Sequence, residues 1–507
     1  MSGALKSSSK EFVRAAVLIC LLTASWPAVI PSVAAANSAV LEERIGRILS
    51  EPPYRRAQVG VHVVELGSGR VIYGRNEERK FIVASNEKLV TAAAALEVLG
   101  ESYEFRTTVL AQGDIVGGVL HGDLILRGGG DPTLGGRYEE EDALTIFRRW
   151  AAVLKARGLQ QVTGDVVADD AFFDRISRHP NWSENEASKW YCPTTSALSV
   201  NDNCVVITVK PGASAGSPAV LSTTPEGAPV ELVNLCKTSP KRQGIWFEHK
   251  GEGNVIAVAG LVSQGSAGYS QQVTLPNPPL YAAGLLKEAL ETEGIEVDGR
   301  ARLAGAGRVQ PAAAVLLSAG GASAAVQPLC VRRTSLIPVL GVMLKESHNY
   351  YAEQLIKTIG AETSGTGSWA AGLARAGAVL REMGFRDTDF NLDDGSGLSR
   401  QNRLTPALLT GLLSRIWSSE HGPTMLSLLA AAGEEGTLVR RLTAPPYRGN
   451  VRAKTGYING VSALSGYATT RAGTEIAFSI LINDPSPAYS MREVRDAICR
   501  AIVDCAE

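Results

Sequence analysis

The spacing of apolar residues along the chain predicts which segments form helices and which form strands. Alternating apolar positions in 59–64, a turn at 67–69 and the apolar run 71–73 predict a β-hairpin. Between about residue 103 and residue 330, short β-type runs alternate with Gly, Pro and Asp turns, which indicates one or two strand-rich insertions. Helices are predicted at 86–96, 280–293, 335–346, 350–359, 367–383, 406–418 and 491–504, and further strands at 460–468 and 474–481. We therefore predict a fold of the α/β (α+β) class, which combines helices with strands, and in which insertions interrupt one domain.

The first residues have the pattern of a secretory signal peptide. A basic stretch precedes the apolar run 15–22, and the small-residue run 32–36 offers a cleavage point near Ala36. The apolar run is too short and too closely followed by prolines for a comfortable membrane span. We expect residues 1–36 to be removed and the mature protein to be periplasmic or secreted. An uncleaved anchor and a buried helix are the competing interpretations.

Composition and charge argue against several classes of function. The 507 residues include 50 basic and 51 acidic ones, so the formal net charge of -1 gives no general attraction to nucleic acid or to an anionic membrane. The histidines are scattered and no C-x-x-C pair occurs, so we expect no metal and no cofactor. The C-terminal helix looks like part of the core, so we expect no strong membrane anchor there.

Cysteines other than Cys20 of the leader are even in number, and disulfides persist in exported proteins. Their short separations favour the pairs Cys192–Cys204 and Cys499–Cys505. Free buried thiols are the alternative, because pairing cannot be read from spacing alone.

One serine and one lysine have the spacing of an activated nucleophile and its base. Ser85 lies at or near the start of the predicted helix 86–96, and Lys88 lies on the same helical face. A lysine that accepts a proton near neutral pH must be neutral there. Its pKa must therefore fall by about 3 from the reference value, which takes roughly 4 kcal/mol of burial or like-charge repulsion. The start of a helix would also place backbone N–H groups beside a reacting carbonyl.

The Ser85-x-x-Lys88 motif is weak by itself, because residues 7–10 of the leader have the same spacing. Two further motifs follow it in order. Ser347-His348-Asn349 lies between two predicted helices, and Lys454-Thr455-Gly456 opens the C-terminal strand region. S-x-N alone also occurs at 183–185 and 199–201, so only the ordered triple is specific.

Two other segments contain residue types that occur in active sites. A G-x-S-x-G match at 212–216 is flanked by prolines, which predicts a turn instead of the strand-to-helix nucleophile elbow. Asp394 and Ser396 lie in a glycine-rich loop. A functional loop and a structural turn are equally good interpretations of that loop.

With its three motifs in this order, the chain resembles the class C low-molecular-mass penicillin-binding proteins, the serine D-Ala-D-Ala carboxypeptidase/endopeptidase family. The resemblance implies the fold of penicillin-recognising serine transpeptidases and β-lactamases, an antiparallel sheet flanked by helices, with inserted β-rich domains. The long insertion between the first two motifs separates this family from the β-lactamases. Further resembling segments are 122–134, 164–173, 196–201, 349–355, 394–400 and 463–467.

The resemblance implies a role for each residue of the first two motifs. Ser85 would attack the carbonyl of the penultimate D-alanine and form an acyl-enzyme, with Lys88 as its base. Ser347 would relay a proton toward the leaving amine. Asn349 would hold Lys88 and the substrate amide, and water would then hydrolyse the acyl-enzyme.

The third motif would bind the substrate. Lys454 and Thr455 would bind the terminal carboxylate, and Gly456 would let the substrate backbone approach the strand. The backbone N–H groups of Ser85 and Tyr457 would form the oxyanion hole. Tyr457 stands where the family often has a hydroxyl residue, which puts any side-chain contact to the carboxylate in doubt.

An inserted acidic residue binds the free amino group of diaminopimelate in related enzymes. Glu186 is the candidate here, and a solvated acid is the competing interpretation. Val83, where the family usually has proline, should matter little.

The resemblance also implies a division of the chain into domains. The catalytic domain would comprise 37–103 and 329–507, domain II would comprise 104–207 and 273–328, and a nested β-rich domain III would comprise 208–272.

The expected activity is that of a D-Ala-D-Ala carboxypeptidase on peptidoglycan stem peptides, extended to D-Ala-diaminopimelate cross-links and inhibited by β-lactams. A second copy of the chain is a further candidate partner. A serine β-lactamase and a wall-binding protein with a vestigial site are the alternatives.

Overall fold

The computed structural model describes all residues except 1–32, 52–55, 252, 306–325, 484–490 and 506–507. The predicted signal peptide lies outside the described residues apart from 33–36, which belong to helix α1 (Val33–Ser50). Among the described helices, none combines the length and the apolar character needed to cross a lipid bilayer.

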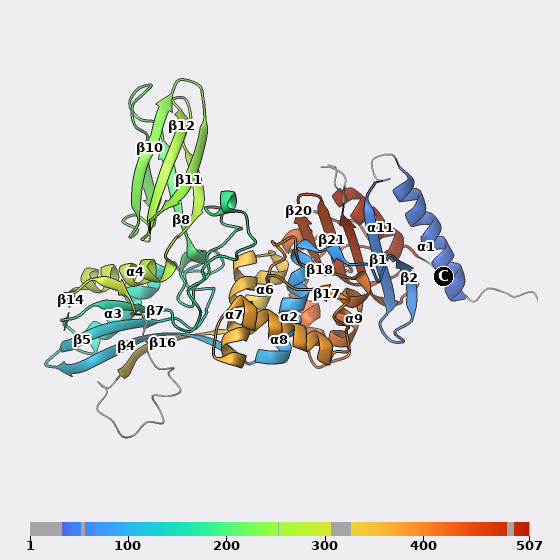
Figure 1. The fold of residues 1–507 in the computed structure, drawn as a ribbon, viewed down its shortest axis with the longest axis horizontal. Coiled ribbons are helices and arrows are strands. Elements are labelled where there is room, and N and C mark those ends of the chain that lie inside the picture. The colour runs from blue at the N-terminus through green and yellow to red at the C-terminus, as the bar shows by residue number, and fades with distance from the viewer. Residues whose placement is uncertain (1–32, 52–55, 252, 306–325, 484–490, 506–507) are drawn as a thin grey trace, which may run out of the picture.

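A six-stranded antiparallel sheet forms the centre of the region that contains all three motifs. Its strand order is β19-β20-β21-β22-β1-β2, so the N-terminal hairpin pairs with the C-terminal strands (Figure 1). The strands are β1 (Gln58–Glu65), β2 (Val71–Arg75), β19 (Ala430–Ala431), β20 (Arg452–Ile458), β21 (Val461–Thr469) and β22 (Glu475–Asn483).

Both faces of this sheet are covered by helices, and so the central strands are apolar nearly throughout. Leu464 and Phe478 pack on the side of α1 and α11 (Met491–Val503), whereas their neighbours Ala463 and Ala477 pack on the opposite side. Successive residues of a strand point to opposite faces, so β21 and β22 are buried on both.

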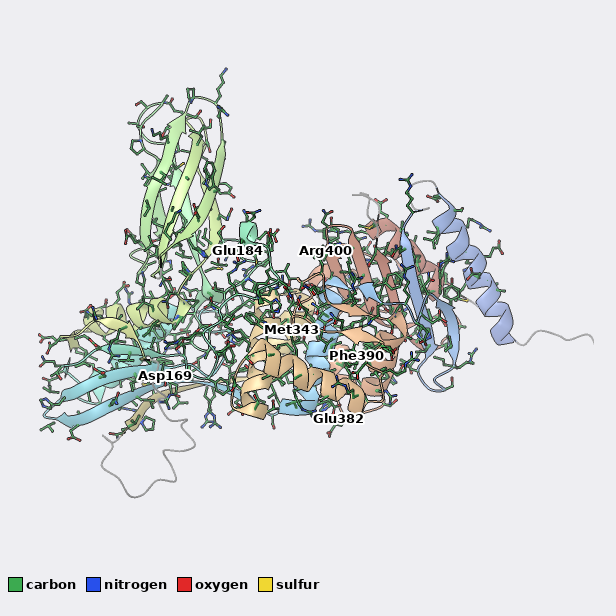
Figure 2. The ribbon with its side chains drawn as sticks, in the orientation of Figure 1. Asp169, Glu184, Met343, Glu382, Phe390 and Arg400 are labelled. Carbon is green, nitrogen blue, oxygen red and sulfur yellow. The ribbon has the colours of Figure 1, made fainter. Side chains whose placement is uncertain are left out.

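The second face supports a helical layer that carries the first two motifs. Met343 of α6 and Phe390 of β17 belong to the core of this layer (Figure 2). Its helices are α2 (Glu87–Leu99), α6 (Leu336–Lys345), α7 (Asn349–Ser364), α8 (Trp369–Glu382), α9 (Pro406–Trp417) and α10 (Gly422–Leu428). A small sheet of β3 (Phe81–Ile82), β18 (Arg403–Leu404) and β17 (Phe390–Asn391) lies beside them.

A seven-stranded sheet with two helices forms the larger insertion. Long antiparallel pairing of β4 with β5 and β16 builds its centre, and α3 packs against α4. Its strands are β4 (Glu104–Val116), β5 (Val119–Arg127), β6 (Gln161–Val162), β7 (Val166–Asp169), β14 (Glu296–Val297), β15 (Ala301–Leu303) and β16 (Val326–Ser335), and its helices are α3 (Ala143–Ala156) and α4 (Pro278–Thr292).

Two three-stranded sheets form a smaller unit, which we call the outer lobe (residues 204–274). Figure 1 shows the outer lobe projecting from the insertion, away from the six-stranded sheet. One sheet contains β8 (Cys204–Lys210), β9 (Val220–Thr224) and β13 (Tyr269–Thr274), and the other contains β10 (Glu231–Ser239), β11 (Gly244–Lys250) and β12 (Val255–Ser263). The larger insertion and the outer lobe resemble the expected domains II and III, whose boundaries remain a proposal.

The predicted helices and C-terminal strands are present within a few residues of their expected bounds, and residues 212–216 form a loop between β8 and β9. Helices α1, α3 and α10 were not predicted. Helix α3 shows a local signal that could have been used. It begins at an N-cap, where the Asp142 side chain accepts a hydrogen bond from the Thr145 N–H.

Both predicted disulfide pairs are wrong, because Cys192, Cys204 and Cys499 are free thiols. Cys499 is buried in α11. Cys192 accepts a hydrogen bond from Arg178, and Cys204 is the first residue of β8.

Candidate active site

A strained turn presents Ser85 at the start of α2. Ser85 is half-buried in a 3-10 turn (Ala84–Asn86) that continues directly into the helix. Ala84 has a φ of 46°, in the left-handed region that L-residues rarely adopt. Such a residue costs of order 1–3 kcal/mol and persists only where the surrounding structure holds it.

Gly456 of β20 packs directly against this turn. A Cβ at Gly456 would lie 2.7 Å from the Val83 carbonyl oxygen and 3.3 Å from the Ala84 Cβ. Only glycine therefore allows β20 and the nucleophile turn to approach this closely. This contact within the chain is a reason for the glycine of K-T-G in addition to the predicted approach of substrate.

Lys88 is fully buried and its amine has three neighbours. Its Nζ lies 2.9 Å from Ser85 Oγ, 2.8 Å from Asn349 Oδ1 and 2.7 Å from the Ser396 carbonyl oxygen. The last two atoms are acceptors only, so they take the two N–H groups of a neutral amine. The lone pair of that amine is then left to face the Ser85 hydroxyl.

Burial supplies the pKa change that a lysine base requires. It lowers the pKa of Lys88 to about 7, against the opposing effect of the buried carboxyl groups of Glu353, Asp394 and Glu87. Lys454 is also buried, and burial followed by repulsion from Lys88 lowers its pKa well below the usual value. Two buried amines therefore share one site.

The second motif lies where α7 begins. Ser347 has a φ of 60° and its Oγ accepts a hydrogen bond from Lys454 Nζ at 2.7 Å. Asn349 donates from Nδ2 to the Tyr191 carbonyl at 2.7 Å, so its Oδ1 is the atom directed at Lys88. The structure therefore joins the first motif to the second through Asn349, and the second to the third through Ser347.

The third motif lies inside strand β20. Asn86 Nδ2 donates to the Lys454 carbonyl at 2.9 Å, which ties the residue after the nucleophile to this strand. Thr455 Oγ1 donates to Thr437 Oγ1 at 2.8 Å. Strand β19 pairs only with Arg452 and Ala453, so in the described residues the outer edge of β20 beyond Ala453 has no strand partner.

The side chains of Tyr457 and Glu186 make their contacts with residues other than Ser85 and Lys88. Tyr457 is 53% exposed, and the Arg492 guanidinium stacks over its ring at 4.0 Å. Glu186 lies in the short 3-10 segment Glu184–Glu186, and its carboxylate accepts a hydrogen bond from Tyr191 Oη at 3.1 Å. The Tyr191 carbonyl in turn binds Asn349, so Tyr191 links Glu186 to the site.

Comparisons with known proteins identify the family of the chain. The sequence profile of the D-Ala-D-Ala carboxypeptidase 3 (S13) family matches residues 41–503. The chain belongs to this family. The D-alanyl-D-alanine carboxypeptidase of Actinomadura sp. (strain R39) is 35% identical over 514 residues, which cover 97% of this chain and 90% of that protein. D-alanyl-D-alanine carboxypeptidase DacB of Haemophilus influenzae is 27% identical over 455 residues, 88% of each chain.

A solved structure has the same fold. Penicillin binding protein 4 (dacB) from Haemophilus influenzae matches with a TM-score of 0.77 and 24% identity, over 90% of this chain and 98% of that one. The predicted family and fold are confirmed, and the protein is a serine hydrolase of the S13 family.

In this S13 protein, the glycine-rich loop after α8 contributes a residue that the sequence motifs do not include. The Ser396 carbonyl binds Lys88, while Asp394 is enclosed by Trp182 Nε1 and by the Gly397 and Ser399 N–H groups. Both interpretations of the loop are therefore partly right, since a structural aspartate folds a turn whose backbone touches the site. A side-chain motif gives no signal for a carbonyl contact.

Within the described residues, no group of three or more His, Cys, Asp or Glu side chains could hold a metal ion. The described site brings together the hydroxyls of Ser85, Ser347 and Thr455, the amines of Lys88 and Lys454 and the amide of Asn349.

Proposed function

We propose that the protein is a periplasmic or secreted D-Ala-D-Ala carboxypeptidase that cleaves peptidoglycan stem peptides through a Ser85 acyl-enzyme. The observation that carries this proposal is the 2.9 Å contact between Ser85 Oγ and a buried Lys88 whose pKa is lowered to about 7. Since half of such a lysine is neutral near pH 7, it can take the serine proton at physiological pH.

Acylation would proceed through three proton transfers. As Ser85 Oγ attacks the carbonyl of the penultimate D-alanine, Lys88 takes the hydroxyl proton, and the backbone N–H groups of Ser85 and Tyr457 stabilise the oxyanion. The C–N bond then breaks, Ser347 gives its hydroxyl proton to the leaving amine of the terminal D-alanine, and the Lys454 ammonium returns a proton to Ser347. The 2.7 Å contact between Ser347 and Lys454 supports this relay. In deacylation, water attacks the ester and gives a proton through Ser347 to Lys454, while the Lys88 ammonium returns its proton to Ser85 Oγ.

Substrate would lie along the outer edge of β20. Because no described strand pairs with that edge beyond Ala453, a peptide can add there as a further strand. Lys454 and Thr455 would bind the terminal carboxylate. A bound carboxylate favours the ammonium form of a buried lysine, so substrate binding would raise the pKa of Lys454 from its lowered value.

We also propose endopeptidase activity on D-Ala-diaminopimelate cross-links, with Glu186 as the acid that binds the free amino group. Its link to Asn349 through Tyr191 supports this role. Glu186→Gln should then raise KM for diaminopimelate-containing peptides and leave hydrolysis of a minimal D-Ala-D-Ala peptide unchanged. Equal effects on both substrates would favour a solvated acid.

Mass spectrometry of the penicillin-treated protein tests the main proposal. We expect one covalent penicilloyl group, which peptide mapping places on Ser85, and no adduct on Ser85→Ala. An adduct of equal yield on Ser85→Ala would contradict the proposal. Rapid turnover of penicillin would instead favour a β-lactamase, and absence of both an adduct and D-Ala-D-Ala hydrolysis would favour a wall-binding protein.

A further inference from the structure

The residue that holds Ser396 against Lys88 is a buried glutamate outside the three motifs. Glu353 Oε1 accepts a hydrogen bond from the Ser396 N–H at 2.8 Å, and Oε2 accepts from the Gly395 N–H at 3.0 Å. Trp369 Nε1 donates to Oε2 at 2.7 Å. One fully buried carboxylate therefore fixes two consecutive backbone N–H groups of the turn whose carbonyl binds the base.

Asn349 and Glu353 are one helical turn apart on α7, so they lie on the same face of that helix. Asn349 contacts Lys88 directly, and Glu353 acts on Lys88 through Ser396. One acceptor of the Lys88 amine thus belongs to this face of α7, and the other is held in place by a residue of the same face.

We propose that Glu353 is a positioning residue for acyl transfer, which holds the Ser396 carbonyl against the Lys88 amine so that the lone pair of the amine faces Ser85. The inference rests on the proposed function, in which Lys88 is the base. It adds a residue to that function whose carboxylate touches neither substrate nor nucleophile.

The turn that Glu353 holds is closely packed against α2, α7 and the nucleophile turn. Thr91 Oγ1 of α2 donates to the Gly395 carbonyl at 2.7 Å, and a Cβ at Gly395 would lie 2.5 Å from Ile356 Cγ1. A Cβ at Gly397 would lie 1.8 Å from the Ala84 carbonyl oxygen, so the same loop also presses on the nucleophile turn. The turn that Glu353 holds therefore contacts both Lys88 and the residue before Ser85.

The ionisable groups around Glu353 also influence the protonation of the Lys88 amine. Burial and repulsion from Asp394 raise the pKa of the Glu353 carboxyl, while the three N–H donors favour its ionised form. Other ionisable side chains that interact with Glu353 or Lys88 include Glu87, Asp394, Lys357, Lys454 and His348.

Glu353→Gln is the decisive substitution, because an amide keeps the shape of the carboxyl group but has one oxygen. Whichever position the NH₂ group takes, at least one N–H donor loses its acceptor and the turn loosens. We expect acylation of Ser85 by a fluorescent penicillin to slow about 100-fold, as for a small misplacement of a catalytic group. The dissociation constant of the non-covalent penicillin complex should stay unchanged, since the carboxylate would be bound by Lys454 and Thr455.

The matched control is Glu362→Gln, an exposed glutamate on the same helix that accepts a hydrogen bond from Tyr103 at 2.9 Å. It should be acylated at the rate of the unmodified chain. A merely structural role of Glu353 predicts a different result, in which fewer molecules are acylated but those that react do so at the normal rate constant.

Each outcome is decisive. A Glu353→Gln variant with the normal rate constant, at full or reduced acylated fraction, would overturn the inference alone. An unmodified chain that is not acylated would overturn the proposed function and the inference with it. If Glu353→Gln does not fold, Thr91→Val removes the hydrogen bond on the other side of the same turn, and acylation should slow about tenfold, the effect of one neutral hydrogen bond. A normal rate for Thr91→Val would then overturn the inference.

Discussion

The six-stranded sheet and the outer lobe are both built from antiparallel or mixed β-pairing, yet only one of them provides an environment for chemistry. Strands β21 and β22 are buried on both faces, whereas β11 exposes every second residue, including Trp246 at 59%. A sheet covered on both faces can remove an amine such as Lys454 from water, which changes its protonation. A sheet with one solvent-exposed face cannot remove an amine on that face from water, so side chains there keep their ordinary chemistry.

Replacing a buried lysine of the site and an exposed lysine of the outer lobe should give the largest contrast. Lys88→Met removes the proposed base and leaves the Asn349 oxygen and the Ser396 carbonyl without a donor. We expect penicillin acylation to slow about 10³-fold or more, the usual range for loss of a general base. Lys237→Met, on the exposed face of β10, should react at the normal rate. A stopped-flow measurement of acylation compares the two, and similar rates would contradict the assignment of Lys88.

The pH dependence of acylation tests whether burial controls the protonation of Lys88, and this test needs no substitution. Only neutral Lys88 accepts a proton, and burial lowers its pKa to about 7. The acylation rate should therefore fall about tenfold for each pH unit below about 7 and level off above it, because the neutral fraction falls in that way. If the rate instead kept rising up to the ordinary lysine pKa, burial would not control this amine.

Two glycines with nearly the same backbone conformation allow the cost of backbone strain to be distinguished from the effect of a steric contact. Gly397 has a φ of 81° and Gly473 a φ of 84°, but a Cβ at Gly397 would overlap the Ala84 carbonyl, whereas none of the described atoms lies within 4 Å of a Cβ at Gly473. Each alanine substitution should cost about 1–2 kcal/mol for the left-handed conformation. Gly397→Ala should additionally displace the nucleophile turn and slow acylation about tenfold or more.

Thermal unfolding and acylation rates of the two variants give the comparison. Equal acylation rates would mean that the loop at Gly397 does not set the position of Ser85.

Much of this organisation was predictable from the sequence. The family was predicted from the order of three motifs, Ser85-x-x-Lys88, Ser347-x-Asn349 and Lys454-Thr455-Gly456. Helix α7 was predicted because its apolar positions recur at the period of a buried helix. That Lys454 lies inside strand β20 was harder to predict from the sequence. This strand is buried at one end and has an open edge, so its buried and exposed residues do not alternate regularly.

The remaining contacts depend on tertiary proximity. The Ser396 carbonyl reaches Lys88 from a loop about 300 positions away in the sequence, and a backbone oxygen has no residue-type signature. Asn86 looked like an ordinary first-turn residue, yet its amide binds the Lys454 carbonyl. The roles assigned to individual site residues stay predictions until the variants are measured.

The smallest expected effects come from a buried tryptophan beside the site, Trp182, and an exposed one in the outer lobe, Trp246. Trp182 is 5% exposed and donates to Asp394 at 2.8 Å, so Trp182→Phe leaves a buried carboxylate oxygen with one donor fewer and should lower the free energy of unfolding by about 1 kcal/mol. Asp394 keeps its bonds to Gly397, Ser399 and Asn402, so the turn should persist and acylation should change little. Trp246→Phe in the outer lobe should change the free energy of unfolding by less than about 0.5 kcal/mol. Denaturant titration measures both, and an equal loss in the two variants would mean that Trp246 is held as tightly in the outer lobe as Trp182 is beside the site.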